Sequence, residues 1–129
     1  MADVIAALPQ PRVPVRGKAD QFFPVHRIYC VGRNFADHAR EMGAAAPASR
    51  AERGTPVFFL KPADAIALQA DIPYPPGTQD LHHEVELVVA LGADAPAGVL
   101  DPADASRLIY GYAVGLDLTR RDLQGAAQT

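Results

Sequence analysis

Two glutamates separated by a single residue, Glu84 and Glu86, are the residues whose types and spacing most directly suggest chemistry. They lie in residues 80–88, DLHHEVELV, where apolar and charged side chains alternate. Because successive side chains of a strand point to opposite faces, Val85 and Leu87 are expected to enter the core while both glutamates project together. Adjacent carboxylates repel one another unless water, a proton or a cation compensates them. A hard divalent cation is the sharper hypothesis, and a solvated outer strand face is the alternative.

A third carboxylate, Asp117, follows the apolar run LIYGYAVGL at residues 108–116, which predicts a buried strand. Thr119, with Asp122 three residues later, is typical of a helix N-cap with an acidic partner. We therefore expect Asp117 to lie in the turn between that strand and a helix, where functional residues often gather. Taken alone, an aspartate at such a place is more typical of a turn than of a ligand.

A histidine and a glutamate three residues apart, His38 and Glu41, suggest proton transfer. Asn34 suits a helix N-cap, Asp37 stands three residues later, and Gly43 can take the left-handed position after a helix, so a short helix is predicted. His38 and Glu41 would share a face of this helix, close enough for the carboxylate to orient the imidazole as a general base. The alternative is a solvated pair on an exposed helix.

Four blocks of the sequence together resemble the fumarylacetoacetate hydrolase family, closest to its small bacterial, fumarylpyruvate hydrolase-like members. They are YCVGRNFADHAREMG (29–43), PVFFLKPADAI (56–66), DLHHEVELVVALG (80–92) and GYAVGLDLTRRDLQ (111–124). The blocks come in the family's order and cover about residues 25 to 125, although none would suffice alone. The implied fold is α+β, with a mostly β, mixed sheet of the β-roll type of the family's C-terminal domain.

The resemblance implies that Glu84, Glu86 and Asp117 hold a catalytic Mg²⁺ or Mn²⁺, with Ca²⁺ as a further option. His38 and Glu41 would sit on a lid over the substrate, where His38 activates water. The remaining residues that it implies contact substrate are Arg33, Lys61, Arg121 and Gln124. Lys61 could instead merely end its strand.

The implied reaction is hydrolysis of a carbon–carbon bond in a β-diketo acid such as fumarylpyruvate or another acylpyruvate. The cation would stabilise the negative charge that develops on the leaving enolate. Related members decarboxylate oxaloacetate, hydrate or isomerise dienoic acids, or act as lyases. A small keto-acid substrate, a role in aromatic catabolism and a homodimer are further expectations from the resemblance.

Composition limits the class of protein. The chain has 129 residues, with 12 Lys and Arg against 15 Asp and Glu and a formal net charge of −3, so one domain at most is expected. The absence of a basic stripe and of an apolar run of roughly 18 residues argues against nucleic-acid and membrane partners. The only cysteine, Cys30, lies in the apolar run IYCV and is predicted to be a buried structural thiol. Without a signal-like N-terminus, a cytoplasmic location is expected.

Residues 1–24 carry four prolines and are predicted to form an extended segment or a single strand, followed by a catalytic-domain half at residues 25–129. Blocks that the family carries later, including an active-site lysine, have no counterpart here. We therefore expect a chain that is incomplete at its C-terminus, a fragment or truncated reading frame, and an inactive fragment or metal-binding module is the rival to the enzyme. Further elements are expected as strands at 27–31 (ended by Gly32), 57–60 and 70–72, and as a helical turn at 103–107 capped by Asp101.

Overall fold

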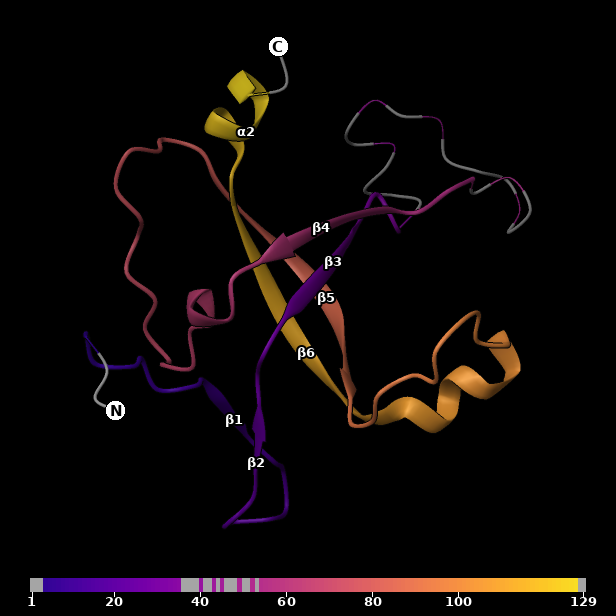
Figure 1. The fold of residues 1–129 in the computed structure, drawn as a ribbon. Coiled ribbons are helices and arrows are strands. Elements are labelled where there is room, and N and C mark those ends of the chain that lie inside the picture. The colour runs from indigo at the N-terminus through magenta and orange to yellow at the C-terminus, as the bar shows by residue number, and fades with distance from the viewer. Residues whose placement is uncertain are drawn as a thin grey trace. The chain divides into compact units, whose positions relative to one another are not determined.

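The computed structural model describes residues 4–35, 40, 43, 45, 49, 52 and 54–127. The chain divides into two compact units, Met1–Ile72 and Pro73–Thr129, which are described separately. The elements are β1 (Arg12–Pro14), β2 (Phe22–Pro24), β3 (Ile28–Gly32), β4 (Val57–Lys61), a 3₁₀-helix (Ala63–Ala65), β5 (Leu81–Leu91), a second 3₁₀-helix (Pro102–Leu108), β6 (Ile109–Arg120) and α2 (Arg121–Ala127) (Figure 1). A mostly β architecture with little helix confirms the predicted fold class.

All strand pairs within the described residues are antiparallel: β1 with β2, β3 with β4, and β5 with β6. The mixed pairing that the resemblance suggested is therefore not seen in this part of the chain. The N-terminal region forms the two short strands β1 and β2 where one extended segment was expected. Directly after β2, Val25 is the one hydrophobic residue among the described residues that is buried, at 8% exposure, and its N–H donates to the Pro11 carbonyl at 2.8 Å.

β3 ends at Gly32, where the sequence predicted the end of this strand. Gly32 is the last residue of β3 and pairs with Val57 of β4. The turn is made instead by Arg33, whose φ of 56° lies in the left-handed region that residues with side chains seldom adopt. Cys30, predicted to be buried, is only half-buried in β3. Further on, Gly43 has the expected left-handed φ of 73°. His38 and Glu41 lie outside the described residues.

The second unit is built on a long two-stranded ribbon, β5 and β6, of 11 and 12 residues (Figure 1). Alternating β-branched, aromatic and leucine side chains favour this pairing. The register runs from Leu81 opposite Arg120 to Ala90 opposite Gly111 and then shifts, so that Leu91 faces Ile109. One extra β6 residue at this shift has the geometry of a β-bulge, which bends the strand locally.

The connection between β5 and β6 begins at Gly92, whose N–H donates to the Leu108 carbonyl at 2.9 Å. A Cβ added to Gly92 would lie 2.8 Å from Cβ of Tyr110, which explains why a glycine stands there. The 3₁₀-helix in this connection is capped as predicted, because Oδ1 of Asp101 accepts a hydrogen bond from the Ala103 N–H at 2.8 Å.

Two local predictions in this unit are wrong, and a third is wrong at the end of the first unit. Asp117 lies inside β6, opposite Glu84, and not in a turn after the strand. Thr119 is likewise a strand residue, opposite His82, because the ladder continues to Arg120 and α2 begins only at Arg121. Residues 70–72 form no strand. The added strand length places Asp117 on a rigid ladder.

The apolar face of the ribbon is exposed, contrary to the prediction that Val85 and Leu87 enter the core. Val85 and Leu87 are 64% and 63% exposed, and Val114 and Leu116 of β6 are 80% and 56% exposed. No described helix has the length and apolar composition needed to cross a membrane. The hydrophobic surface of this unit is thus concentrated on one sheet face.

Candidate metal centre

The three carboxylates singled out in the sequence lie on one face of the β5–β6 ribbon. Residues directly opposite each other in an antiparallel ladder point to the same face, and residues two apart on a strand do so too. The register pairs Glu84 with Asp117 and Glu86 with Gly115. All three carboxylate residues are half-buried. Directly opposite Cβ atoms are about 4.5–5.5 Å apart, so the backbone brings Glu84 and Asp117 within reach of one ion.

Small residues of β6 line the same face. Gly111, Ala113 and Gly115 alternate with larger side chains that point to the other face. A Cβ added to Gly115 would lie only 2.8 Å from Cγ2 of Val88, so Val88 packs over this position and only a glycine fits there. Hard divalent cations prefer such a set of carboxylate oxygens, and the residues present therefore fit a Mg²⁺ or Mn²⁺. The pattern G-x-A-x-G-x-D was the signal in the sequence that could have located this face.

A cation already contacts this face, because the guanidinium of Arg121 at the start of α2 donates through Nη2 to Oε1 of Glu84. The two side chains are only 15% and 19% exposed. By contrast, the Arg107–Asp104 pair on the 3₁₀-helix is 80% and 44% exposed. The Arg121–Glu84 pair is thus partly shielded from water, where charge pairing is stronger than on an open surface. Sequence reasoning missed this pair because 37 positions separate the two residues.

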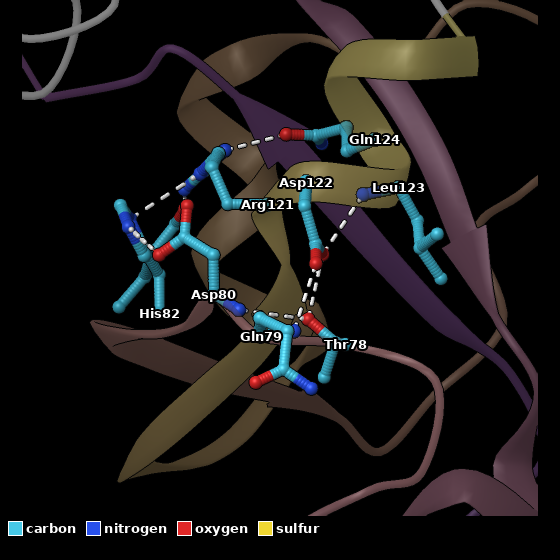
Figure 2. A network of polar contacts seen from close by, with 9 residues as sticks. Thr78, Gln79, Asp80, His82, Arg121, Asp122, Leu123 and Gln124 are labelled. Atoms are coloured by element: carbon cyan, nitrogen blue, oxygen red, sulfur yellow. Dashed lines mark hydrogen bonds and ion pairs between the residues drawn. The ribbon is translucent and has the colours of Figure 1, made fainter.

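Arg121 has three further attachments. Its Nε donates to Nδ1 of His82 at 3.3 Å, and its Nη1 donates to Oε1 of Gln124 (Figure 2). Its backbone N–H donates to the Asp80 carbonyl at 2.8 Å. Nε2 of His82 lies 3.0 Å from Oδ1 of Asp80. His82 therefore holds the guanidinium that contacts Glu84 through its Nε, and Gln124 holds it through Nη1.

A second set of hydrogen bonds joins α2 to the residues before β5. Thr78, which is 4% exposed, donates through its hydroxyl to Oδ1 of Asp122 at 2.6 Å. The N–H of Gln79 donates to Oδ2 of Asp122 at 2.9 Å (Figure 2). The Thr78 hydroxyl and, to a smaller extent, the Gln79 N–H lower the pKa of Asp122 because they stabilise its ionised form. Slight desolvation raises the pKa, but by less. Asp122 thus binds a segment 44 residues away, and not the Thr119 N-cap predicted for it.

The side-chain oxygens of the three carboxylates are not gathered at one point. Within the part of the chain that the structure describes, no three His, Cys, Asp or Glu side chains converge as ligands of one ion. The register is nevertheless set by the whole β5–β6 ladder, whereas a glutamate side chain changes direction by rotating about its own bonds. Oε1 of Glu84 contacts Arg121 and is turned toward it. The oxygens of the three carboxylates can therefore come together by rotation of side chains, without a change in the strands.

The other predicted site residues belong to the first unit or are not described. Lys61 is half-buried at the end of β4, opposite Ile28, and lines a shallow depression with His26 and Arg27. Arg33 is exposed in the turn after β3. Roles for Arg33, Lys61, His38 and Glu41 stay predictions.

Comparison with known proteins identifies relatives of this chain. The family model described as fumarylacetoacetate (FAA) hydrolase C-terminal matches residues 27–129. The mitochondrial oxaloacetate tautomerase FAHD1 of Bos taurus is 46% identical over 98 residues, which are 75% of this chain and 41% of the relative. The oxaloacetate tautomerase YcgM of Escherichia coli K12 is 40% identical over 104 residues, 80% of this chain and 44% of the relative.

Among solved structures, the fumarylpyruvate hydrolase from Pseudomonas aeruginosa in complex with Mn²⁺ and pyruvate matches with a TM-score of 0.80 and 42% identity. The match covers 98% of this chain and 53% of that one. The chain thus spans about half the length of the relatives it matches. Because the family model covers residues 27–129 and the mostly β fold agrees with that of the solved neighbour, this chain belongs to the fumarylacetoacetate hydrolase family.

Proposed function

We propose that this chain carries the metal-binding part of a divalent-metal-dependent hydrolase that cleaves a carbon–carbon bond in β-diketo acids of the fumarylpyruvate or acylpyruvate type. The observation that carries the proposal is the register that sets Glu84 opposite Asp117 and Glu86 on the same face. Support for the substrate class comes from the solved neighbour, which holds Mn²⁺ and pyruvate. Pyruvate is the product expected when an acylpyruvate is hydrolysed.

The residues of the second unit have distinct roles in this proposal. Glu84, Glu86 and Asp117 would hold the cation, which, when bound, supplies Lewis-acid stabilisation of a developing oxyanion. Arg121 presents a planar guanidinium beside that site, the group best suited to bind a substrate carboxylate through two hydrogen bonds. Gln124 keeps the guanidinium oriented. The arrangement would thus hold a keto acid by its charged end.

Water activation is assigned to His38 and Glu41 on the basis of the family resemblance. His38 would accept a proton from water while the water oxygen bonds to the distal carbonyl carbon. The carbon–carbon bond then breaks, its electron pair passes to the pyruvate enolate, and that enolate takes up a proton. One acylpyruvate and one water thereby give one carboxylic acid and one pyruvate.

Oxaloacetate tautomerisation is the second candidate, because the relatives from Bos taurus and Escherichia coli are named for it. That reaction moves a proton between carbon and oxygen, consumes no water and releases no pyruvate. A metal-binding module without turnover is the alternative from another class.

The products distinguish these functions. Purified chain is incubated with Mn²⁺ and fumarylpyruvate, and fumarate and pyruvate are quantified, while the enol of oxaloacetate is followed in a parallel reaction. A hydrolase would give equal amounts of fumarate and pyruvate, lost in Asp117→Asn and retained in Asp104→Asn, which removes an exposed carboxylate of the 3₁₀-helix. Conversion of the oxaloacetate enol without pyruvate from fumarylpyruvate would identify a tautomerase. Mn²⁺ binding without any turnover would favour the module, and no Mn²⁺ binding would contradict the proposal.

A further inference from the structure

The guanidinium of Arg121 contacts two parts of the site, a proposed metal ligand and the helix α2. One terminal nitrogen of its guanidinium contacts Glu84, a proposed metal ligand, and the other contacts Gln124 on α2. The Nε contact with His82 and the backbone N–H bond to the Asp80 carbonyl attach the same residue to the start of β5. Only one of these four contacts involves a proposed metal ligand, so Arg121 stays anchored when Glu84 turns away from it.

We propose that Arg121 is the counter-ion of the metal-free site: its Nη2 contacts Glu84 until a divalent cation takes Glu84 as a ligand, and the freed Nη2 then binds the carboxylate of the substrate. This inference rests on the proposed metal site. It deepens the proposed function because it sets an order of binding, cation first and keto acid second. It also makes Arg121, and not only the carboxylates, a determinant of metal affinity.

Electrostatics favours the exchange. A guanidinium and a divalent cation repel each other, and in a partly shielded site the repulsion is several times stronger than in open water. Both also compete for the oxygens of Glu84, which are needed to complete the ligand set. The side-chain exposures of 15% for Arg121 and 19% for Glu84 mean that solvent screens this competition only in part. The cation therefore binds against the free energy of the Arg121–Glu84 contact.

Reciprocity gives a second consequence. Any contact that Arg121 makes with a substrate carboxylate is available only after Glu84 has released it, so the cation and the anion strengthen each other's binding by the same factor. Couplings of this kind are typically about 5- to 150-fold.

The test is the affinity for Mn²⁺ alone, measured by calorimetric titration of the unaltered chain, Arg121→Gln and Arg120→Gln. Arg120 is the matched control because it is the adjacent residue, carries the same charge, is exposed and pairs with Leu81 on the opposite face of the ribbon. We expect Arg121→Gln to bind Mn²⁺ at least about fivefold more tightly, the lower end of ordinary coupling. Arg120→Gln should change the affinity by less than about twofold, because an exposed charge is screened.

Two further measurements do not depend on the folding of Arg121→Gln. Arg121→Lys keeps the charge but loses the planar fork, and it should tighten Mn²⁺ binding by a smaller factor than Arg121→Gln. A crystal structure of the unaltered chain with Mn²⁺ should place Nη2 of Arg121 beyond hydrogen-bond distance from Glu84, with the His82 and Gln124 contacts retained.

The outcomes separate this inference from the proposed function. If the unaltered chain binds no Mn²⁺, both are contradicted. If it binds Mn²⁺ and the two glutamine variants have equal affinities, the metal site stands and the counter-ion role of Arg121 is wrong. An Arg121–Glu84 contact that persists beside bound Mn²⁺ would have the same meaning. The inference is supported when the affinity gain is confined to position 121.

Discussion

Arg121 compensates the negative charge of Glu84, and the ion pair that they form is largely shielded from water. A carboxylate with a 19% exposed side chain, opposite the carboxylate of Asp117, is unfavourable without a cation nearby. In the metal-free chain Arg121 provides that charge. Because breaking a shielded pair leaves one charge uncompensated, substitutions here should affect stability more than substitutions of surface pairs do.

The first prediction concerns metal-dependent stability at Glu86. Mn²⁺ should raise the melting temperature of the unaltered chain, since a ligand that binds only the native state adds about 2.7 kcal/mol at a concentration of 100 times Kd. Glu86→Gln removes one ligand and should abolish most of this gain. Differential scanning calorimetry with and without Mn²⁺ measures it, and Asp104→Asn serves as the control. A melting temperature indifferent to Mn²⁺ in the unaltered chain would rule the site out.

The second prediction concerns acid stability at Asp122. The pKa of Asp122 is lowered on folding, chiefly by the Thr78 hydroxyl and then by the Gln79 N–H, so its ionised form favours the folded chain. This contribution is fully present above the pKa that Asp122 has in the unfolded chain, about 4. It is lost as the pH falls through the lower pKa of Asp122 in the folded chain. Asp122→Asn should therefore be less stable than the unaltered chain at pH 7, and the difference should shrink in strong acid.

Urea denaturation at several pH values tests this, with Thr78 as the second position. Thr78→Val should reproduce the loss because it removes the hydroxyl, whereas Thr78→Ser should retain it. A difference between Asp122→Asn and the unaltered chain that stays constant down to strong acid would show that the Thr78 contact does not stabilise the ionised carboxylate.

At the scale of elements, the β5–β6 ribbon positions the site through the choice of residues on its two faces. Glycine and alanine of β6 lie on the face of the carboxylates, while tyrosine, valine and leucine occupy the opposite face. The helix α2 follows β6 without an intervening loop, so Arg121 and Gln124 lie next to the end of the ladder. The ribbon and the first turn of α2 together form the candidate site.

The third prediction tests the packing of Val88 over Gly115, which lies opposite Glu86. In Gly115→Ala the new Cβ would meet Cγ2 of Val88 at 2.8 Å, and the β-branched Val88 has little freedom to turn away. We expect a loss of about 1–3 kcal/mol, as in other overpacked sites, together with weaker Mn²⁺ binding. Gly111→Ala is the matched control on the same face, because its Cβ meets nothing within 4 Å. Equal stabilities and Mn²⁺ affinities of the two variants would contradict this account of the face.

For the whole molecule, the exposed apolar face of the ribbon matters most. Four large side chains, Val85, Leu87, Val114 and Leu116, are each at least 56% exposed on this face. Contiguous apolar surface on a two-stranded sheet with accessible edges favours association with other chains. The solution behaviour of the isolated chain should therefore depend on this face.

The fourth prediction is that the chain self-associates with rising concentration through this face. Val114→Lys places a charge at its centre and should shift the association to higher concentration. Val99→Lys is the control, because Val99 is equally apolar and 103% exposed but lies in the loop before the second 3₁₀-helix. Sedimentation velocity over a concentration series measures the effect. A chain that stays monomeric throughout, or an equal response of both variants, would contradict the prediction.

The sequence alone determined the features that depend on neighbouring residues. Alternation around Glu84 and Glu86 predicted a strand with both carboxylates on one face, because the two-residue period is a property of any extended backbone. Asp101 was predicted as a cap from the same local logic. The family was recognisable because its blocks are short and contiguous. None of these inferences required knowledge of which strand pairs with which.

Only the tertiary structure decided the features that depend on residues far apart in the chain. The register with β5 extended β6 to Arg120 and so placed Asp117 opposite Glu84, where local capping patterns had predicted a turn. The Arg121–Glu84 and Thr78–Asp122 contacts span 37 and 44 positions. Pairing of this kind is set by the summed hydrogen bonds and packing of a whole ladder, which local periodicity does not encode. The counter-ion at the candidate metal site was for this reason visible only in the folded chain.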